Sequence, residues 1–441
     1  MRKRILTRAL AAGLLPAAAL LAVAGQARAS GFSIYEAGSR ATALGCAFTA
    51  TADDGSALFY NAAGLSFQNG RGLDLNFIGV APQFKFAGHL SQGDALQTGE
   101  SADRVYLVPG TAYTNSTSEK LAWGVGLYAP FGLGVEWKDG ADWVGRRISH
   151  DVAIETIYVT PAVSYMAAEG LAVAIGVDIA SQHLSLKKYS PEPQFGTNAL
   201  ETEIEGRSEI NLTPTFGVMY RPTPEWSFGA MYHFEKTMEF EDRTATLTNV
   251  QALGETWAAT LLAGLGGSEQ LLSSELNLPS IMSLGVAYQA SERLRVEGNY
   301  VRFGWSAFEK LALDFDTDAL DQSIYFGYED SWQVRFGGEY WATDNVSLMA
   351  GYVHDKTPQP LISVSPLLPD SDRNDYSFGV RYLHGNWDLS ASYMVVVGTE
   401  RTNVVNGEPL RHYTADGKSD YPFGSYKSLA NLFGVGLRYN F

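Results

Sequence analysis

Large apolar residues alternate with small or polar ones along most of the chain after residue 70. From Asn431 to Phe441 the odd positions are mostly large and apolar, whereas the even positions include Gly, Arg and Asn. The same alternation runs from Trp387 to Tyr393 and from Trp332 to Tyr340. Because neighbouring side chains of a strand point to opposite faces, this period of two predicts strands with one apolar face and one polar face.

A short motif, Gly-x-x-Tyr followed by a polar turn, recurs where one apolar run ends and the next begins. The repeat predicts antiparallel hairpins with short turns at one end and long loops at the other. The recurring Tyr places an aromatic ring at a lipid–water interface, which favours a membrane barrel over a soluble β-sandwich, the alternative that also alternates. The motif starts at Gly110, Gly217, Gly285, Gly337, Gly379 and Gly436, and at Ala162 in a variant form.

The pattern therefore predicts an all-β fold, a transmembrane antiparallel β-barrel of about 14 strands over residues 71–441, with lipid outside and a polar lumen inside. We expect strands near 72–86, 105–115, 121–136, 151–166, 171–189, 206–221, 226–242, 276–289, 294–315, 322–341, 346–356, 373–383, 387–400 and 425–441. We expect the long outer loops at 190–205, 243–275, 357–372 and 401–424.

The first 29 residues have the features of a secretory signal. A basic front precedes an apolar core from Leu14 to Val23, and Ala27-Arg28-Ala29 is a cleavage site, so the mature chain should begin at Ser30. The signal would remove five of the 32 basic residues and none of the 48 acidic ones, which leaves a net charge of −21. That charge argues against a nucleic-acid partner. A secreted, acidic, strand-rich chain with a single cysteine, Cys46, is typical of the outer membrane of a Gram-negative bacterium.

Residues 30–70 lack both the alternation of a membrane strand and the long stripe of a globular helix. They are rich in Ala, Gly, Ser and Thr but also contain Phe32, Tyr35 and Phe48, which need burial. We expect this segment to form a hatch, or plug, inside the barrel; a flexible linker is the alternative.

The third expected strand is interrupted by Pro130, Phe131 and Gly132. Pro donates no ladder hydrogen bond, and Gly in a strand marks a bulge or bend. Because an unpaired backbone group is costly in lipid, this break should open onto the lumen or onto a gap in the wall. An ordinary bend near the outer end of the strand is the alternative.

The loop after the seventh strand carries apolar residues at helical spacing. This pattern predicts an apolar helix in a loop that should face water, and we interpret it as one wall of an external apolar groove, with packing on the barrel rim as the alternative. The residues are Val250, Leu253, Trp257, Leu261 and Leu265.

Motifs of catalysis are absent from the sequence. It contains no P-loop, Cys-x-x-Cys, His-Glu-x-x-His or Gly-x-Ser-x-Gly motif, and its seven His are scattered. We expect no enzyme activity, no metal and no cofactor. A general porin for polar solutes and an outer-membrane hydrolase are competing functions, which the plug-like segment and the lack of a convincing Ser–His pair disfavour.

Together these motifs resemble the FadL family, outer-membrane transporters of long-chain fatty acids with relatives that admit toluene and other aromatic hydrocarbons. Two positions depart from the family pattern: the usual Asn-Pro-Ala or Asn-Pro-Gly turn is Asn61-Ala62-Ala63, and a usual Gly is Cys46. The resemblance rests on Gly38 to Phe48, Ala52-Asp53-Asp54, Tyr60 to Leu65, Ala129 to Gly132, Asn277-Leu278-Pro279, Asp330-Ser331-Trp332 with Arg335 and Gly337, and Leu368 to Arg373.

The resemblance implies a route for a hydrophobic small molecule, with long-chain fatty acids as the first candidate and aromatic hydrocarbons or alkanes as the alternative. The substrate would land in the outer-loop groove, the hatch would move, and the substrate would leave sideways into membrane lipid at the kinked third strand. Lys188 resembles a basic position near an acidic head group, and Phe441 resembles the signal read by the barrel assembly machinery. The gating residues implied are Asn61, Ala62, Ala63, Gly64, Pro130, Phe131 and Gly132.

Overall fold

The computed structural model describes residues 31–89, 95–191, 197–251, 256–405, 408–410 and 422–441. The predicted signal peptide and Leu253 lie outside these residues. Within them, fourteen antiparallel strands pair in one closed ring, as the alternation predicted. The first and last strands close it, from Gly72 opposite Asn440 to His89 opposite Phe423. In ring order the strands are β1 (Arg71–His89), β3 (Tyr106–Ser116), β4 (Leu121–Tyr128), β6 (Asp151–Ala168), β7 (Leu171–Pro191), β9 (Asn211–Tyr220), β10 (Trp226–His233), β13 (Ile281–Ser291), β14 (Leu294–Phe303), β17 (Ser331–Trp341), β18 (Val346–Asp355), β19 (Arg373–His384), β20 (Trp387–Gly398) and β24 (Phe423–Asn440).

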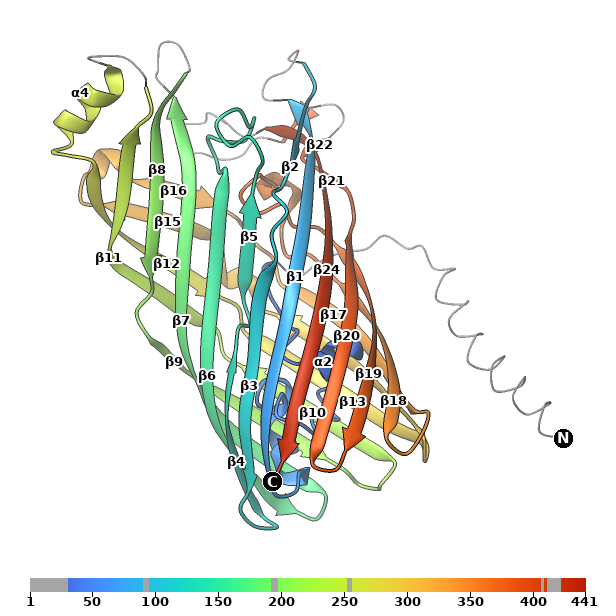
Figure 1. Cartoon of the computed structure of the whole chain (residues 1–441). Coiled ribbons are helices and arrows are strands. Elements are labelled where there is room, and N and C mark those ends of the chain that lie inside the picture. The colour runs from blue at the N-terminus through green and yellow to red at the C-terminus, as the bar shows by residue number, and fades with distance from the viewer. Residues whose placement is uncertain (1–30, 90–94, 192–196, 252–255, 406–407, 411–421) are drawn as a thin grey trace.

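Further strands extend the ring upward beyond the short-turn half (Figure 1). Two of the expected outer loops, 190–205 and 243–275, are therefore partly wrong, because β8, β11 and β12 occupy much of them. The extensions are β2 (Gln97–Glu100), β5 (Gly132–Glu136), β8 (Asn198–Arg207), β11 (Lys236–Asn249), β12 (Glu269–Leu278), β15 (Lys310–Phe315) and β16 (Gln322–Tyr325), with the short β21 (Arg401–Thr402), β22 (Val404–Val405) and β23 (Glu408–Pro409) at the rim.

The polarity of the two faces inverts along the strands. On β7 the outward side chains are Val, Ile, Val and Ile from Val173 to Ile179, and then Ser, His, Ser and Lys from Ser181 to Lys187. The inward side chains change the opposite way, from Ala and Asp178 below to buried Leu184 and Leu186 above. The lipid-facing band thus ends near residue 180, and the lumen above it is apolar rather than polar as expected. The inversion also explains the missed strands, since their outward face is polar.

The Gly-x-x-Tyr motifs lie at the short-turn ends of their strands, and Tyr165, Tyr220, Tyr340 and Tyr382 are exposed on the outside there. This is the interfacial placement that the motif predicted. None of the helices in the described ranges is long and apolar enough to cross a membrane.

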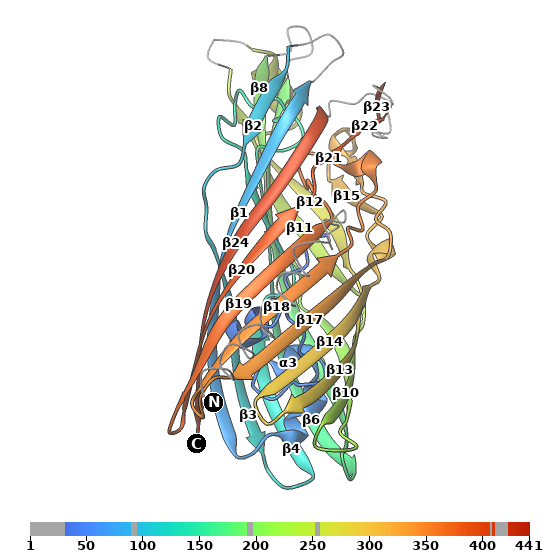
Figure 2. The same cartoon turned by 90° about the vertical axis from the view of Figure 1, so that its right-hand side faces the viewer.

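The N-terminal segment, residues 31–70, lies inside the barrel, with most of it in the lower half (Figure 2). Its helices are α2 (Ser39–Ala43), which packs on β18, β19, β20 and β24, α3 (Ala57–Tyr60), and the 3-10 helix η1 (Ala62–Phe67), which packs on β6, β7 and β9. Glycines in the wall allow this close approach: a Cβ on Gly337 or Gly351 would clash with the backbone at Leu44 and Gly45. The remaining short helices are α4 (Trp257–Gly264), η2 (Trp305–Ala307), η3 (Asp318–Leu320) and η4 (Leu361–Ser363).

Candidate functional site

The barrel wall contains a break at the third strand, where the sequence predicted one. β4 ends at Tyr128, and β5 starts at Gly132 and forms its ladder with β6. On its other side, β3 pairs with β4 no higher than Gly110, opposite Tyr128. Pairing across the break resumes only at the bridge between Ser101 and Trp137. We call the opening between residues 103–109 and 129–135 the wall gap.

The first residues of the N-terminal segment close the wall gap from inside as a short added strand. Ser33 pairs with Phe131, and the Ile34 N–H donates to the Pro130 carbonyl at 2.8 Å. The Gly132 N–H donates to the Phe32 carbonyl at 3.0 Å. Backbone groups that the break leaves without a neighbouring strand are thus paired by residues 31–36, which we call the front segment.

Aromatic rings hold the front segment in place. The ring of Phe32 lies 4.8 Å from that of Trp305 and 5.6 Å from that of Phe308, both edge-on, and 6.0 Å from that of Phe131. Across the wall gap, the Tyr106 ring lies against Gly134, where a Cβ would overlap it. The Tyr106 side chain thus spans part of the gap between β3 and β5, where no backbone ladder joins them.

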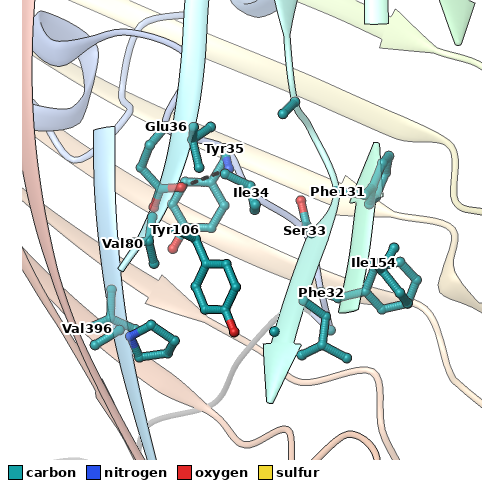
Figure 3. Close-up of a pocket in the computed structure, with 18 of the residues that line it drawn as sticks. Phe32, Ser33, Ile34, Tyr35, Glu36, Val80, Tyr106, Phe131, Ile154 and Val396 are labelled. Carbon is teal, nitrogen blue, oxygen red and sulfur yellow. Dashed lines mark hydrogen bonds between the residues drawn. The ribbon is translucent and has the colours of Figure 1, made fainter. Parts of the chain in front are cut away.

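A cavity of about 300 Å³ runs through the wall gap (Figure 3). Inside the barrel it is lined by the front segment, Val396 and Leu432. At its outer end it is lined by Leu107 and Ile157, which are 66% and 39% exposed on the outward face. The cavity thus joins the lumen to the lipid-facing surface, and most of its walls are apolar.

The inner end of the cavity is polar and carries carboxyl groups. Glu36 is only 6% exposed, and its Oε2 accepts the Tyr35 N–H at 3.0 Å. Burial raises the pKa of Glu36. Asp370 accepts the Gly31 N–H at 3.0 Å, and burial raises its pKa to about 6. Arg373 also lines this end and forms an ion pair with Asp355 at 2.8 Å.

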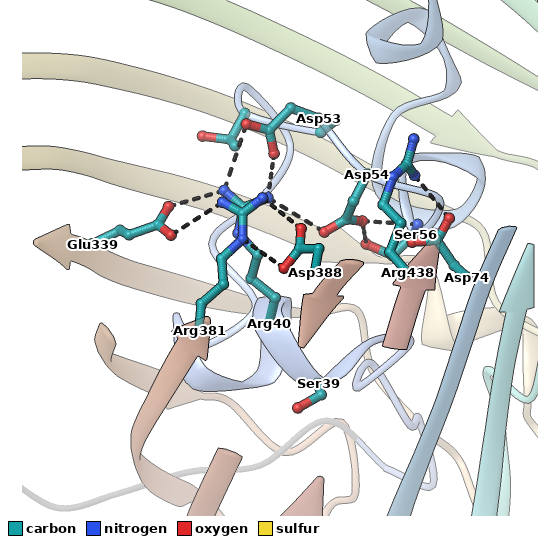
Figure 4. A network of polar contacts seen from close by, with 12 residues as sticks. Ser39, Arg40, Asp53, Asp54, Ser56, Asp74, Glu339, Arg381, Asp388 and Arg438 are labelled. Atoms are coloured by element: carbon teal, nitrogen blue, oxygen red, sulfur yellow. Dashed lines mark hydrogen bonds and ion pairs between the residues drawn. The ribbon is translucent and has the colours of Figure 1, made fainter. Parts of the chain in front are cut away.

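Below the cavity, buried ion pairs tie the N-terminal segment to the barrel (Figure 4). Arg40 of α2 pairs with Asp53 and, at 2.9 Å, with Glu339 of β17. Arg295 of β14 bridges the same two carboxylates at 2.9 and 2.7 Å. Burial opposes the charge of Asp53, but Arg40 and Arg295 outweigh it and hold the pKa of Asp53 well below its usual range. Such a network fixes residues 38–54 against the wall.

The predicted turn at Asn61 to Gly64 is the start of η1. The Asn61 side chain caps this helix by accepting the Ala63 N–H at 3.2 Å and donates to the Val218 carbonyl of β9 at 2.9 Å. Ala62 and Ala63 are buried beside it. Cys46, at the position where a Gly is usual, has φ of 55°, the left-handed conformation that favours Gly.

The helix α4, which carries two of the residues expected to form an outer groove, lies at the rim of the barrel (Figure 1). Trp257 and Leu261 on α4 pack against a small cluster with Ala199 and Leu200 of β8. Leu265 follows α4 and is partly buried, and the Val250 N–H donates to the Ala199 carbonyl at 3.0 Å. These contacts describe packing on the rim; the groove stays a prediction.

Lys187 and Lys188 point in opposite directions at the outer end of β7. Lys187 faces outward and pairs with Glu203 at 2.6 Å. Lys188 faces the lumen, where its Nζ donates to the Gln322 amide oxygen from β16. Lys188 is not among the residues that line the cavity.

Sequence reasoning found the break but missed the residues at the inner end of the cavity. Glu36 stands out in the sequence as a charge within the apolar run from Phe32 to Tyr35, a signal that could have marked it. Asp370 and Arg373 lie in a motif that carried the family resemblance, but nothing local to that motif indicates a cavity.

Comparisons with known proteins agree with this geometry. Residues 20–441 match the model of a family described as "Outer membrane protein transport protein (OMPP1/FadL/TodX)". The chain is 22% identical to a long-chain fatty acid transport protein of Escherichia coli O6:H1, over 96% of this chain and 97% of that one. Among solved structures, it is similar in fold to a FadL homologue of Pseudomonas aeruginosa, with a TM-score of 0.78, 20% identity, and coverage of 93% and 100% of the two chains. It is also similar in fold to the toluene transporter TodX of Pseudomonas putida, with a TM-score of 0.66, 18% identity, and coverage of 95% and 100%.

Proposed function

Since the chain belongs to the outer membrane protein transport protein family (OMPP1/FadL/TodX), whose proteins are transport channels for hydrophobic substrates and not enzymes, we propose that its substrate leaves the barrel sideways through the wall gap. One observation carries the proposal. The cavity of about 300 Å³ has its inner end in the lumen and its outer end at lipid-facing side chains.

Physical chemistry favours this route for an apolar molecule. Transfer of apolar surface into water is unfavourable, so a path from an apolar upper lumen directly into lipid avoids the costly step. Leu184 and Leu186 of β7 are among the buried residues of that upper lumen. The N-terminal segment acts as a hatch: the front segment must leave Pro130 to Gly132 before a substrate can pass.

A reversible cross-link tests whether the front segment must move. Ser33 and Phe131 lie directly opposite each other, and the two backbone hydrogen bonds flank them rather than join them. Antiparallel pairs of this kind have the shorter Cα–Cα separation, which is within the range that a disulfide needs. We expect the double variant Ser33→Cys/Phe131→Cys to lose uptake of a hydrophobic substrate when oxidised and to recover it with reductant.

The single variants Ser33→Cys and Phe131→Cys serve as controls, each alongside the native buried Cys46. Unchanged uptake in the oxidised double variant, with the disulfide verified by mass spectrometry, would refute gating by the front segment. Liposome swelling with sugars tests whether the protein is instead a general porin, because a porin would pass polar solutes in every variant.

For the substrate class, the relatives' names point both to fatty acids and to toluene. Lys188 faces the lumen, and its hydrogen-bond partner, the Gln322 amide, carries no charge. The ammonium group can therefore pair with the carboxylate of a substrate at the outer mouth, which supports an acid. Lys188→Ala should then impair uptake of a long-chain fatty acid and spare toluene, and Lys187→Ala should do neither. Equal effects on both substrates would make Lys188 a rim charge only.

A further inference from the structure

The inner end of the cavity presents acceptors of hydrogen bonds rather than free cations. Of the described residues that line the cavity, Arg373 is the only cation, and its Nη2 is 2.8 Å from Asp355. Glu36 and Asp370 both line the same end, and neither has an ion-pair partner among the described residues. A ligand entering here therefore meets two carboxyl groups beside one lining cation, Arg373, which is already paired with Asp355.

Glu36 is directed at the cavity rather than at the protein. It is 94% buried in the chain, its Oε2 accepts the Tyr35 N–H, and the residue lines the cavity. A buried carboxyl group gains from each further hydrogen bond that it accepts, so it favours an occupant that donates one. Figure 3 shows Glu36 beside Tyr35.

We propose that Glu36, supported by Asp370, makes the inner end of the cavity a selectivity filter that accepts uncharged hydrophobic molecules bearing a hydroxyl group and rejects carboxylates. The proposal rests on the proposed function, because it assigns a substrate class to the same cavity. It places neutral molecules ahead of the fatty acids that the sequence put first.

The preference follows from what each head group would meet. A hydroxyl donates a hydrogen bond to the Glu36 carboxyl group and adds no charge. A hydrocarbon makes no hydrogen bond there. A carboxylate adds a buried negative charge beside Glu36 and Asp370, where the one cation of the described cavity lining, Arg373, is already paired with Asp355, and burial of an unpaired ion is the costliest of the three. The expected order of affinity is hydroxyl, hydrocarbon, carboxylate.

Three ligands that share one ring separate these cases: p-cresol, toluene and p-toluate, titrated calorimetrically at neutral pH into the purified, folded full-length mature protein. In the wild type we expect p-cresol to bind about tenfold more tightly than toluene, since it gains one charge-assisted hydrogen bond, and p-toluate to bind least. Glu36→Gln should leave toluene unchanged, weaken p-cresol and strengthen p-toluate about tenfold.

Glu275→Gln is the matched control. Glu275 of β12 is exposed and is not among the residues that line the cavity, so the identical substitution there should leave all three affinities unchanged. Heat-modifiable mobility on gels checks that each variant is a folded barrel.

Two results would overturn the filter alone: p-toluate binding as tightly as toluene to the wild type, or Glu36→Gln shifting all three ligands equally. In both cases the ligands would still bind in the cavity, so the proposed sideways route would stay intact. Failure of all three ligands to bind a folded wild type would overturn the filter and the cavity's role in transport together.

Discussion

The lower and upper halves of the barrel have opposite polarity and hold the N-terminal segment in different ways. In the lower half, apolar side chains face lipid and buried ion pairs such as Arg40–Glu339 join the segment to the wall. In the upper half, the outside turns polar and the inside apolar above the lipid-facing band. At the upper edge of that band, the front segment is held by two backbone hydrogen bonds, by the hydrogen bond from Gly31 to Asp370 and by aromatic contacts. The difference indicates a fixed lower plug and a movable front segment.

Two deletions should give the largest difference in effect between the two halves of the barrel. Removing residues 31–50 takes away Arg40 and α2, so we expect a folded barrel with a large ion conductance in planar bilayers. Removing only residues 31–36 opens the wall gap but leaves α2, α3 and η1 in place, so conductance should stay near that of the wild type. Equal conductance in the two deletions would break the comparison.

Arg40→Ala should loosen the lower half. It leaves Asp53 and Glu339 with fewer cations in a buried site, and breaking a buried pair costs about 3–5 kcal/mol. We expect faster hydrogen exchange of the amides of residues 38–50. The control is Arg293→Ala, whose pair with Asp344 is exposed and 4.0 Å long, and it should leave exchange unchanged.

Ile34→Pro should loosen the upper half alone. It removes the N–H that donates to the Pro130 carbonyl, a loss of about 1 kcal/mol. If front-segment release limits transport, uptake of a hydrophobic substrate should rise about fivefold, the factor that this free energy represents. Ile34→Val keeps the N–H and should behave as the wild type; slower uptake in Ile34→Pro would contradict a gating role.

Trp257→Asp tests the rim. Trp257 is partly buried, so loss of its apolar contact should cost about 1 kcal/mol in substrate capture, less than the full burial of a large side chain. We expect weaker uptake at low substrate concentration and normal barrel assembly. Uptake equal to that of the wild type would refute the outer groove.

The two halves should also differ, more subtly, in their response to acid. The pKa of Asp370 is raised to about 6 in the folded state, above the unfolded value of about 3.9, so protonation stabilises the docked front segment as pH falls through 6. The pKa of Asp53 is depressed, so its contribution is present above pH of about 4 and is lost only below it. From pH 7.5 to 5, exchange corrected for its intrinsic rate should slow at residues 31–34 and stay constant at 38–50. A parallel response in both stretches would contradict the division.

The sequence by itself determined the class of fold and the position of its main irregularity. Alternation at every second residue is a local property of a strand, and it predicted a ring of about fourteen strands. The Gly-x-x-Tyr motif predicted the interfacial tyrosines, and Pro130 and Gly132 predicted the break. Alternation failed for β8, for most of β12 and for the outer part of β11, because above the lipid band the outward face turns polar and the rule used to recognise a membrane strand no longer applies.

Only the tertiary structure decided what the break does. Ser33 meets Phe131, and Gly31 meets Asp370, across 98 and 339 residues of sequence. Glu36 lies at the inner end of a cavity whose outer end includes Leu107. These contacts depend on ring closure and on the path of the N-terminal segment through the lumen, which periodicity cannot encode, because a period describes one strand and its two faces while a cavity needs the relative positions of several.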